Sequence, residues 1–326
     1  MKVSTNFLEH QNILDNRYIL QEMLGSGLTS KVFKVLDVQT GEIKAAKIFE
    51  NNMSETFQKE AKIINLLNEL NVPSNIKCYS IDIGYLAQDE KKEKKMYEIL
   101  EYGEHGSLFD RVESTQEGFS EDVCKYLLLQ ILNAMEAIHS KGICHRDFKP
   151  ENMLFVGDNY ELKLCDFGFA IRFLNKENQK RKLRNPVGTP YYCAPEILEG
   201  KNYDGEKVDI FSIGASLFVL MTRKFGFEEA KVNNISMKVS KILYKLIKTK
   251  QYEKYWEYIE KYFKIQNLSE QFKNLFVKMV AYNPEERPTI DEIRKDDFMK
   301  DITNENLELL TELKKKMIKE LNQTDE

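Results

Sequence analysis

The sequence has few cysteines and no hydrophobic run long enough to cross a membrane. Its cysteines are odd in number and form no C-x-x-C pair: Cys78, Cys124, Cys144, Cys165 and Cys193. This pattern is typical of reduced intracellular thiols and argues against a disulfide framework or a paired-cysteine zinc site. The longest apolar run, residues 208–221, is too short to span a bilayer and has Asp209 inside it. We expect no membrane span and a cytoplasmic protein, with the nucleus as the alternative compartment.

The sequence also lacks a large excess of charge of either sign. Lys and Arg number 48 against 52 Asp and Glu, so the net charge is -4. Acidic residues interleave with the lysine runs, and we therefore expect no nucleic-acid partner. The N-terminus has no apolar segment of the signal-peptide kind, and Lys2 excludes N-myristoylation. A hydrophobic fraction of 42% predicts a large folded core in one or two domains.

Hydrophobic periodicity predicts strands in the first part of the chain. Residues 18–49 alternate between apolar and polar side chains and predict hairpins. Residues 54–70 follow a helical period, and residues 76–102 return to strand-like runs. We expect a hydrophilic loop at residues 87–95 to divide these last runs.

The remainder of the chain is predicted to be mostly helical. The helical pattern starts after Gly106, and Ser120 is a plausible N-cap for a helix that is apolar nearly all round. Two short strands are expected on either side of the turn at residues 156–161. Long helical segments follow from residue 208 to the end. There is no internal repeat, so the pattern indicates a small β-rich part followed by a large α-rich part.

A glycine-containing hairpin is the first stretch that suggests chemistry. The segment "LGSGLTSKVFKV", residues 24–35, has the spacing G-x-G-x-x-S-x-V. Glycines allow backbone N–H groups to approach phosphate oxygens closely. A glycine-bearing turn without a ligand is the alternative interpretation. The dinucleotide-binding fingerprint is excluded because no helix is predicted directly after the loop.

A lysine in the next predicted strand also suggests a polar site. Lys47 lies between apolar neighbours in "IKAAKIF", where a buried ammonium needs a partner. Glu60, on the helix that follows, is the nearest acid that could supply one. An ordinary lysine on an edge strand is the alternative.

The segment "ICHRDFKPENMLF", residues 143–155, places charged and amide groups between apolar ends. A buried carboxylate at Asp147 could accept a proton from a hydroxyl, and Lys149 could neutralise a phosphate. Asn152 and, nineteen residues after Asp147, Asp166 offer oxygen ligands suited to magnesium. Two carboxylates could also indicate glycoside hydrolysis, but the lysine and the glycine loop have no role in that reaction.

Four motifs together resemble the eukaryotic protein kinase family over about residues 18–298. They are "HRDFKPEN", "DFG", "GTPYYCAPE" and "NPEERP", in the family's order. The resemblance implies an α+β, bilobal protein kinase fold with a small β-rich N-terminal lobe (about 18–102) and a large α-rich C-terminal lobe (about 103–298). Residues 1–17 are then an N-terminal extension, and residues 299–326 an amphipathic helical tail.

The resemblance also implies roles for individual residues. Catalytic roles fall to Asp147 as the base, with Lys149, Lys47 and its partner Glu60. The implied magnesium ligands are Asn152 and Asp166. The implied ATP-binding residues are Leu24, Gly25, Gly27, Ser30, Val32, Ala45, Lys47, Leu100, Glu101, Tyr102 and Leu154. Structural pairs are also implied, between Glu196 and Arg287 and between Asp209 and the catalytic loop.

The implied function is a protein serine/threonine kinase that uses ATP and Mg²⁺ and phosphorylates Ser or Thr hydroxyls of protein substrates. A pseudokinase scaffold is the alternative, but it would lack a lysine, base or metal ligand that this chain has. A small-molecule kinase would generally lack "GTPYYCAPE". The wording of the motifs is nearest to the calcium/calmodulin-regulated group.

Two further features bear on partners. Glu151, Glu228 and Glu229 lie where the relatives bind basic residues upstream of the target, whereas Ser107 replaces an acid there. Residues 302–322 have apolar side chains at helical offsets, interleaved with lysines. This tail is expected either to pack on the large lobe or to bind a calmodulin-like or other regulator.

The activation segment has no residue that could be phosphorylated between Gly168 and Val187. Kinases that keep the arginine of "HRD", here Arg146, commonly need an anion to order this segment. Glu177 is the only acid in the stretch. The sequence therefore suggests that Glu177 or an anionic partner takes the place of a phosphate.

Overall fold

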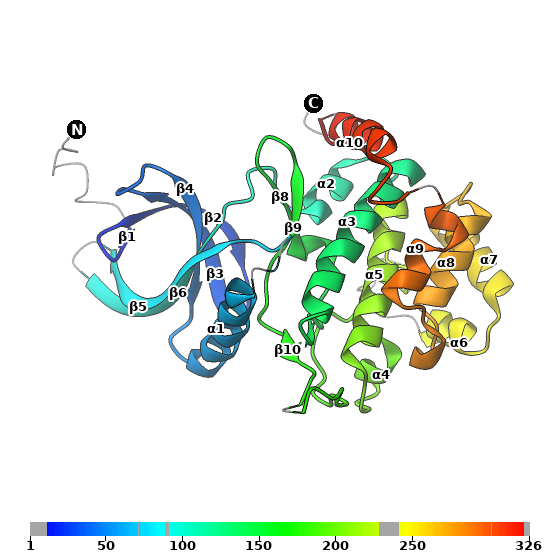
Figure 1. Ribbon diagram of the computed structural model, residues 1–326, viewed down its shortest axis with the longest axis horizontal. Helices are drawn as coiled ribbons and strands as arrows, with labels where there is room; N and C mark the ends of the chain where they lie inside the picture. Colours follow the sequence, from blue (N-terminus) through cyan, green and yellow to red (C-terminus); the bar gives the residue numbers. More distant parts are fainter. Residues whose placement is uncertain are drawn as a thin grey trace. The chain divides into compact units, whose positions relative to one another are not determined.

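The computed structural model of the protein describes residues 12–70, 72, 74–88, 91–175, 177–227, 241–300 and 302–322. Contacts divide the chain into two compact units, Met1–Glu104 and His105–Glu326 (Figure 1). Most residues in long strands belong to the first unit and most helices to the second. The predicted α+β class is confirmed. Among the described residues, no helix is both long enough and apolar enough to cross a membrane.

The first unit is a closed antiparallel barrel with one helix. Its elements are β1 (Ile13–Leu14), β2 (Tyr18–Ser26), β3 (Ser30–Asp37), β4 (Ile43–Phe49), α1 (Ser54–Glu69), β5 (Cys78–Gln88) and β6 (Lys91–Leu100). The strand order is β1-β2-β3-β4-β6-β5. The predicted hairpins, the helix and the two later strands are confirmed.

The short strand β1 closes the barrel, because it pairs antiparallel with β2 on one side and with β5 on the other. Asp15 and Asn16 form the turn between β1 and β2 with φ values of 50° and 52°. Asp and Asn tolerate this left-handed conformation better than most residues. The Asp15 carboxylate accepts hydrogen bonds from the backbone N–H of Tyr85 and the hydroxyl of Tyr97, each at 2.6 Å. These contacts attach the turn between β1 and β2 to the strands β5 and β6.

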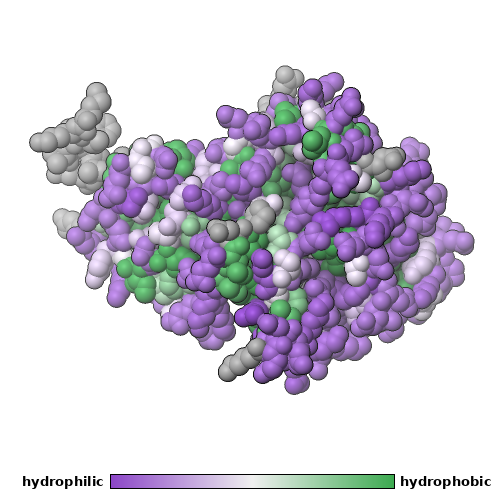
Figure 2. All heavy atoms as spheres, in the orientation of Figure 1, coloured by the Kyte–Doolittle hydropathy of each residue, from purple (hydrophilic) through white to green (hydrophobic). Residues whose placement is uncertain are grey.

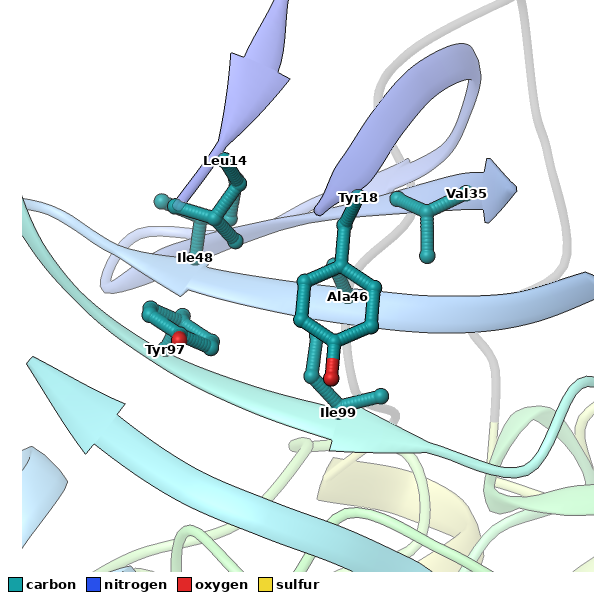
Figure 3. Packing of buried hydrophobic residues seen from close by; sticks show 7 residues of the cluster. All are labelled: Leu14, Tyr18, Val35, Ala46, Ile48, Tyr97 and Ile99. Atoms are coloured by element: carbon teal, nitrogen blue, oxygen red, sulfur yellow. The ribbon is translucent and has the colours of Figure 1, made fainter. Parts of the chain in front are cut away.

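The interior of the barrel is filled by side chains from five strands (Figure 3). The buried cluster consists of Leu14, Tyr18, Val35, Ala46, Ile48, Tyr97 and Ile99. These residues recur at every second position of their strands, as expected for a sheet with one face toward the core. Leu14 belongs to this cluster, so β1 contributes to the core as well as to the strand order.

β4 is buried on both faces, and its two lysines point to opposite sides. Lys44 and Lys47 are three positions apart in an extended strand, and their side chains are 6% and 9% exposed. Phe49, on the face of Lys47, packs edge-on against Phe57 of α1 with the ring centres 5.1 Å apart. The helix α1 therefore covers the side of β4 that carries Lys47.

The loop predicted at residues 87–95 is mostly strand, so that prediction is wrong. The ladder of β5 and β6 continues through Leu86 paired with Glu93, Ala87 with Lys92 and Gln88 with Lys91. The end of β5 and the start of β6 are exposed to solvent. Lysine and glutamate side chains can occupy such exposed strand positions because no face of the ladder is buried there. Residues 88–95 contain no apolar side chain, so no alternation of apolar and polar residues indicates a strand there.

A buried carboxylate at the end of β3 gives the first unit a pH-dependent stability. Asp37 is fully buried and accepts bonds from Arg17 Nε and Nη2 at 2.9 and 2.8 Å and from Lys44 Nζ at 2.8 Å. These partners, Arg17 first, hold the pKa of Asp37 far below its usual value. Because the folded pKa lies below the unfolded value of about 3.9, the stabilisation is present above about pH 4 and lost as the pH falls further.

We expect Asp37→Asn to remove most of the acid-induced loss of stability between pH 5 and pH 2. Urea unfolding at several pH values measures this effect. Glu22→Gln is the matched control, because Glu22 pairs with Lys34 at 3.2 Å but its side chain is 63% exposed. Parallel pH profiles for Asp37→Asn and the wild type would contradict the assignment.

The second unit contains the remaining elements. Its helices are α2 (Leu108–Ser114), α3 (Glu121–His139), α4 (Pro195–Leu198), α5 (Gly205–Thr222), α6 (Lys241–Lys248), α7 (Tyr252–Phe263), α8 (Glu270–Met279), α9 (Ile290–Arg294) and α10 (Leu307–Asn322). Its strands are β7 (Ile143–Cys144), β8 (Met153–Val156), β9 (Glu161–Leu164) and β10 (Ile171–Arg172). Short 3₁₀ turns are Pro150–Asn152, Pro284–Glu286 and Asp297–Met299.

Two helices form the centre of the second unit. α3 begins after Ser120, whose hydroxyl accepts from the N–H of Val123, as predicted for an N-cap. α5 is buried on all sides and packs against α3 and α8. Figure 2 shows a predominantly hydrophilic surface over α7, α8 and α9. Their apolar residues, such as Trp256, Phe276 and Ile293, are buried.

The tail helix α10 packs on α3 of the same unit (Figure 1). Leu313, Met317 and Leu321 are buried on its inner side. The Glu320 carboxylate accepts from both the N–H and the hydroxyl of Ser120, at 3.0 and 2.5 Å. Of the two roles considered for this tail, the structure favours packing on the large unit.

Candidate functional site

The loop between β7 and β8 is held by a carboxylate from the central helix α5. Asp209 accepts hydrogen bonds from the backbone N–H groups of His145 and Arg146 at 2.9 and 2.8 Å. It also accepts from His139 Nε2 at 2.8 Å. Arg146 has a φ of 66°, a conformation that L-residues rarely adopt, and these bonds offset its cost. The predicted tie between Asp209 and this loop is present.

Asp147, the predicted base, has one carboxylate oxygen fixed by Thr189. The N–H and the hydroxyl of Thr189 both donate to Asp147 Oδ1, at 2.7 and 2.8 Å. Lys149 Nζ donates to the Thr189 hydroxyl at 3.0 Å and lies 3.5 Å from Asp147 Oδ2. Asp147 is only 5% exposed, so its charge is largely buried. The second oxygen, Oδ2, is oriented toward the lysine and can accept a proton.

The paired strands β8 and β9 bring the two predicted metal ligands to one end of their ladder. Met153 pairs with Leu164, and the carbonyl of Asn152 accepts from the N–H of Cys165 at 2.9 Å. Asn152 is the acceptor residue of this bond, and Asp166 directly follows its donor, Cys165. Asn152 Nδ2 donates to the Asp147 carbonyl at 2.9 Å, which turns its amide oxygen away from that bond. An amide and a carboxylate oxygen fit a hard cation such as magnesium.

The first unit holds the predicted lysine pair. Lys47 Nζ donates to Glu60 Oε1 at 2.5 Å, and the two side chains are 9% and 2% exposed. Lys47 is therefore a buried, paired cation, not an edge-strand lysine. The pair connects β4 to α1.

Strand register gathers five of the predicted ATP-binding residues on one face of the first unit. Gly25 of β2 is opposite Val32 of β3, and Val32 is opposite Lys47 of β4. Ala45, two positions before Lys47, is opposite Leu100 of β6. Residues directly opposite in an antiparallel ladder project from the same face. Leu24, Ser30, Glu101 and Tyr102 belong to the same unit, whereas Leu154 on β8 belongs to the second unit.

Neither loop glycine is required by the local backbone. A Cβ at Gly25 would meet no atom within 4 Å, and one at Gly27 would meet only the Ser30 carbonyl at 3.7 Å. Neither has a positive φ. The space beside both glycines is open, which suits close approach of a phosphate better than it suits the ligand-free turn.

The expected pair of Glu196 and Arg287 is present and deeply buried. Arg287 Nη1 and Nη2 each donate to one Glu196 oxygen at 2.7 Å. Arg287 also donates to the carbonyls of Ala281 and Lys207, at 2.8 and 2.9 Å. Its side chain is 0% exposed. The pair joins the start of α4 to the segment before α9.

Most of the chain matches the model of a known protein family. A model described as the protein kinase domain matches residues 18–299. The chain belongs to the protein kinase family. The family implies the bilobal fold, and the resemblance seen in the four motifs is confirmed.

Curated relatives place the kinase near calcium-regulated serine/threonine kinases. It is 29% identical over 287 residues to "CBL-interacting protein kinase 26" of Oryza sativa subsp. japonica. The matched residues make up 88% of this chain and 53% of that relative. It is 32% identical over 298 residues to "Calcium-dependent protein kinase 5" of Plasmodium falciparum, with 90% and 47% covered. It is 32% identical over 232 residues to "CBL-interacting serine/threonine-protein kinase 20" of Arabidopsis thaliana, with 70% and 50% covered. The kinase spans about half the length of these relatives.

One sequence-based idea about the kinase site, the role of Glu177 as a substitute for a phosphate, needs revision. Glu177 is exposed, and its backbone N–H donates to Asn175 Oδ1, so it lies in a local turn and makes no contact with Arg146. The Arg146 guanidinium instead donates to the Phe169 carbonyl and to the Tyr203 hydroxyl, and sequence reasoning missed Tyr203. Glu228 and Glu229 lie outside the described residues.

The cysteine next to the site, Cys193, is buried. Burial raises the pKa of Cys193 to about 12. A thiol with this pKa is protonated at neutral pH and reacts slowly. The polar groups that the structure brings together near Cys193 are the Asp147 carboxylate, the Lys149 ammonium and the Thr189 hydroxyl.

Proposed function

We propose that the chain is an ATP-dependent protein serine/threonine kinase, with Asp147 as the catalytic base. The observation that carries the proposal is the Asp147 carboxylate, which is nearly buried, fixed at Oδ1 by two bonds from Thr189 and approached by Lys149. Residues of the first unit, above all the Lys47–Glu60 pair and the glycine loop, would bind the phosphates of ATP. Leu24, Val32, Ala45, Leu100, Glu101, Tyr102 and Leu154 would contact its adenosine part.

In this reaction, Oδ2 of Asp147 accepts the proton of the substrate hydroxyl while the hydroxyl oxygen attacks the γ-phosphorus. The bond between that phosphorus and the β,γ-bridging oxygen breaks, and ADP leaves. Lys149 holds positive charge beside the transferring phosphoryl group. Catalysis then rests on positioning and electrostatics, since no bond to the protein forms.

Asn152 and Asp166 are the residues that would hold Mg²⁺. When bound, the cation neutralises negative charge on the phosphate oxygens. Asn152 is positioned for this by its bond to the Asp147 carbonyl, and Asp166 by its place directly after β9. Asn152 and the proposed base thus lie on one short stretch of backbone, and the pairing of β8 with β9 connects Asp166 to it.

The assay that tests the proposal uses purified protein, radiolabelled ATP, Mg²⁺ and a generic protein substrate. Label on serine or threonine of the substrate supports the proposal. No transfer, with ATP or a partner protein still bound, supports the pseudokinase scaffold. Label on a small molecule alone would support a small-molecule kinase.

We further propose a preference for arginine upstream of the target residue. Glu151 lies beside the catalytic loop, and its carboxylate accepts from the Tyr192 hydroxyl at 3.3 Å. Burial raises the pKa of Glu151, so a cationic side chain would find a poorly solvated acid there. Ser107 is engaged in capping α2 and adds no acid. A peptide library tests this, and a preference for acidic or proline-directed sites would contradict it.

Residues 302–322 are the segment that we propose as the binding site of a calmodulin-like or other regulator. Because Leu313, Met317 and Leu321 are buried, a regulator would have to lift α10 away from α3. We place the kinase in the cytoplasm, in keeping with its five free cysteines.

Met317→Ala is expected to lower the free energy of unfolding by about 2–4 kcal/mol, because it leaves a cavity under α10. Met317 is 0% exposed, whereas the control Lys315→Ala alters an exposed position of the same helix. A chain that ends at Lys300 should likewise melt at a lower temperature. Higher activity of that shorter chain at unchanged stability would instead indicate autoinhibition.

A further inference from the structure

The guanidinium of Arg146 is bound by neutral oxygens. Its Nε donates to the carbonyl of Phe169 at 2.7 Å, and its Nη1 donates to the hydroxyl of Tyr203 at 2.9 Å. Arg146 is only 8% exposed. No carboxylate of the described residues pairs with this guanidinium. Asp209 contacts Arg146 too, but it accepts from the backbone N–H and not from the side chain.

Tyr203 connects Arg146 to the activation segment. Its hydroxyl accepts from Arg146 and donates to the carbonyl of Asn185 at 2.8 Å. Its backbone exchanges two hydrogen bonds with Leu183, each at 2.8 Å. Tyr203 is 1% exposed and Leu183 is 5% exposed, so the connection is shielded from water. One residue therefore fixes the segment at two points.

The phenol is suited to a permanent role of this kind. Burial raises the pKa of Tyr203, which keeps the hydroxyl protonated at neutral pH. A neutral hydroxyl can accept from the arginine and donate to the carbonyl at the same time, whereas a carboxylate could only accept. The arrangement satisfies all three groups without a negative charge.

The sequence of the segment excludes the usual anion. Residues 169–186 contain no serine, threonine or tyrosine, so no phosphate can be attached to a hydroxyl there. Glu177, the only acid of the stretch, is exposed in its own turn. The contacts that hold residues 183 and 185 of the segment in this structure are those of Tyr203.

We propose that Tyr203 is a positioning residue that orders the activation segment through Arg146, so that this kinase needs no phosphate on residues 169–186. The expected effect of Tyr203 on the rate rests on the proposed kinase function. Its expected effect on the order of the activation segment does not. It predicts that protein made in bacteria and treated with phosphatase is fully ordered at residues 183–187.

The test is Tyr203→Phe, which removes the hydroxyl and keeps the buried ring. We expect kcat/KM for a protein substrate to fall about tenfold, the effect of one lost hydrogen bond to a charged group. Amide exchange at residues 183–187 should rise. Tyr255→Phe is the matched control, because this buried hydroxyl donates to the Gly226 carbonyl at 2.7 Å, away from the segment. It should leave exchange at residues 183–187 unchanged.

A double variant separates positioning from a general loss of structure. If the hydroxyl acts through the guanidinium, Tyr203→Phe should have a smaller effect on rate once Arg146→Met is present, because only the bond to the Asn185 carbonyl is then left to lose. Additive effects of the two substitutions would overturn the proposal. So would wild-type rate and wild-type exchange in Tyr203→Phe.

The dephosphorylated wild type provides a measurement that does not depend on the variant folding. Protected amides at Leu183 and Tyr203 support the proposal, and unprotected amides overturn it. If these amides are protected and Tyr203→Phe loosens them, but no phosphate is transferred, the ordering role stands and the proposed kinase function fails.

Discussion

Replacing Asp147 by asparagine is expected to lower the rate of phosphoryl transfer by on the order of 10³-fold or more. The amide oxygen of asparagine can still accept both bonds from Thr189 at the Oδ1 position, so the loop should keep its shape. What is lost is the carboxylate oxygen Oδ2, which we propose as the acceptor of the proton of the substrate hydroxyl. Single-turnover assays with saturating ATP measure the chemical step directly.

Asp158→Asn is the matched control, because Asp158 is an exposed carboxylate in the turn between β8 and β9. It should retain the wild-type rate. Lys47→Met should be impaired as strongly as Asp147→Asn, since it removes the buried cation paired with Glu60. Near-normal turnover by Asp147→Asn with an unchanged melting temperature would show that another group acts as the base.

The second large effect concerns stability. Arg287→Met should lower the free energy of unfolding by about 3–5 kcal/mol, because it leaves the Glu196 carboxylate buried without its partner. Replacing both members, with Glu196→Leu added, should restore much of the loss, since no unpaired charge remains. Urea denaturation of the three proteins measures both steps.

Arg294→Met is the control for geometry alone. Arg294 also donates to both oxygens of a glutamate, Glu136, but the two side chains are 21% and 48% exposed. Its loss should cost about 1 kcal/mol or less. Equal destabilisation by Arg287→Met and Arg294→Met would mean that burial does not govern the strength of the pair.

Residue types and their spacing predicted the parts of the fold that depend on periodicity or on motifs. The run of β4, the N-cap of α3 and the apolar helix α5 are recognisable because each has a local signal several residues long. The contacts of Lys47 with Glu60 and of Glu196 with Arg287 followed from the family's motifs. Their chemistry could be anticipated as well, because buried charges need partners.

Other features depend on contacts that no local pattern encodes. β1 has two residues, too few for a period, and its place follows from pairing with strands far along the chain. Tyr203 lies 57 positions after Arg146 and looks like an ordinary aromatic residue before a helix. Glu177 was favoured because it has the right charge, but the turn at Asn175 keeps it elsewhere.

The closure of the barrel by β1 has a consequence for solubility. Strands at the edge of a sheet present unpaired N–H and C=O groups that can pair with another molecule. In the described part of the first unit, β1 occupies the position between β2 and β5 where those two edges would otherwise lie open. A chain shortened to begin at Tyr18 would keep every residue of the candidate site and yet expose both edges. Aggregation through strand addition is the failure to expect from such a chain, well before any loss of catalytic groups.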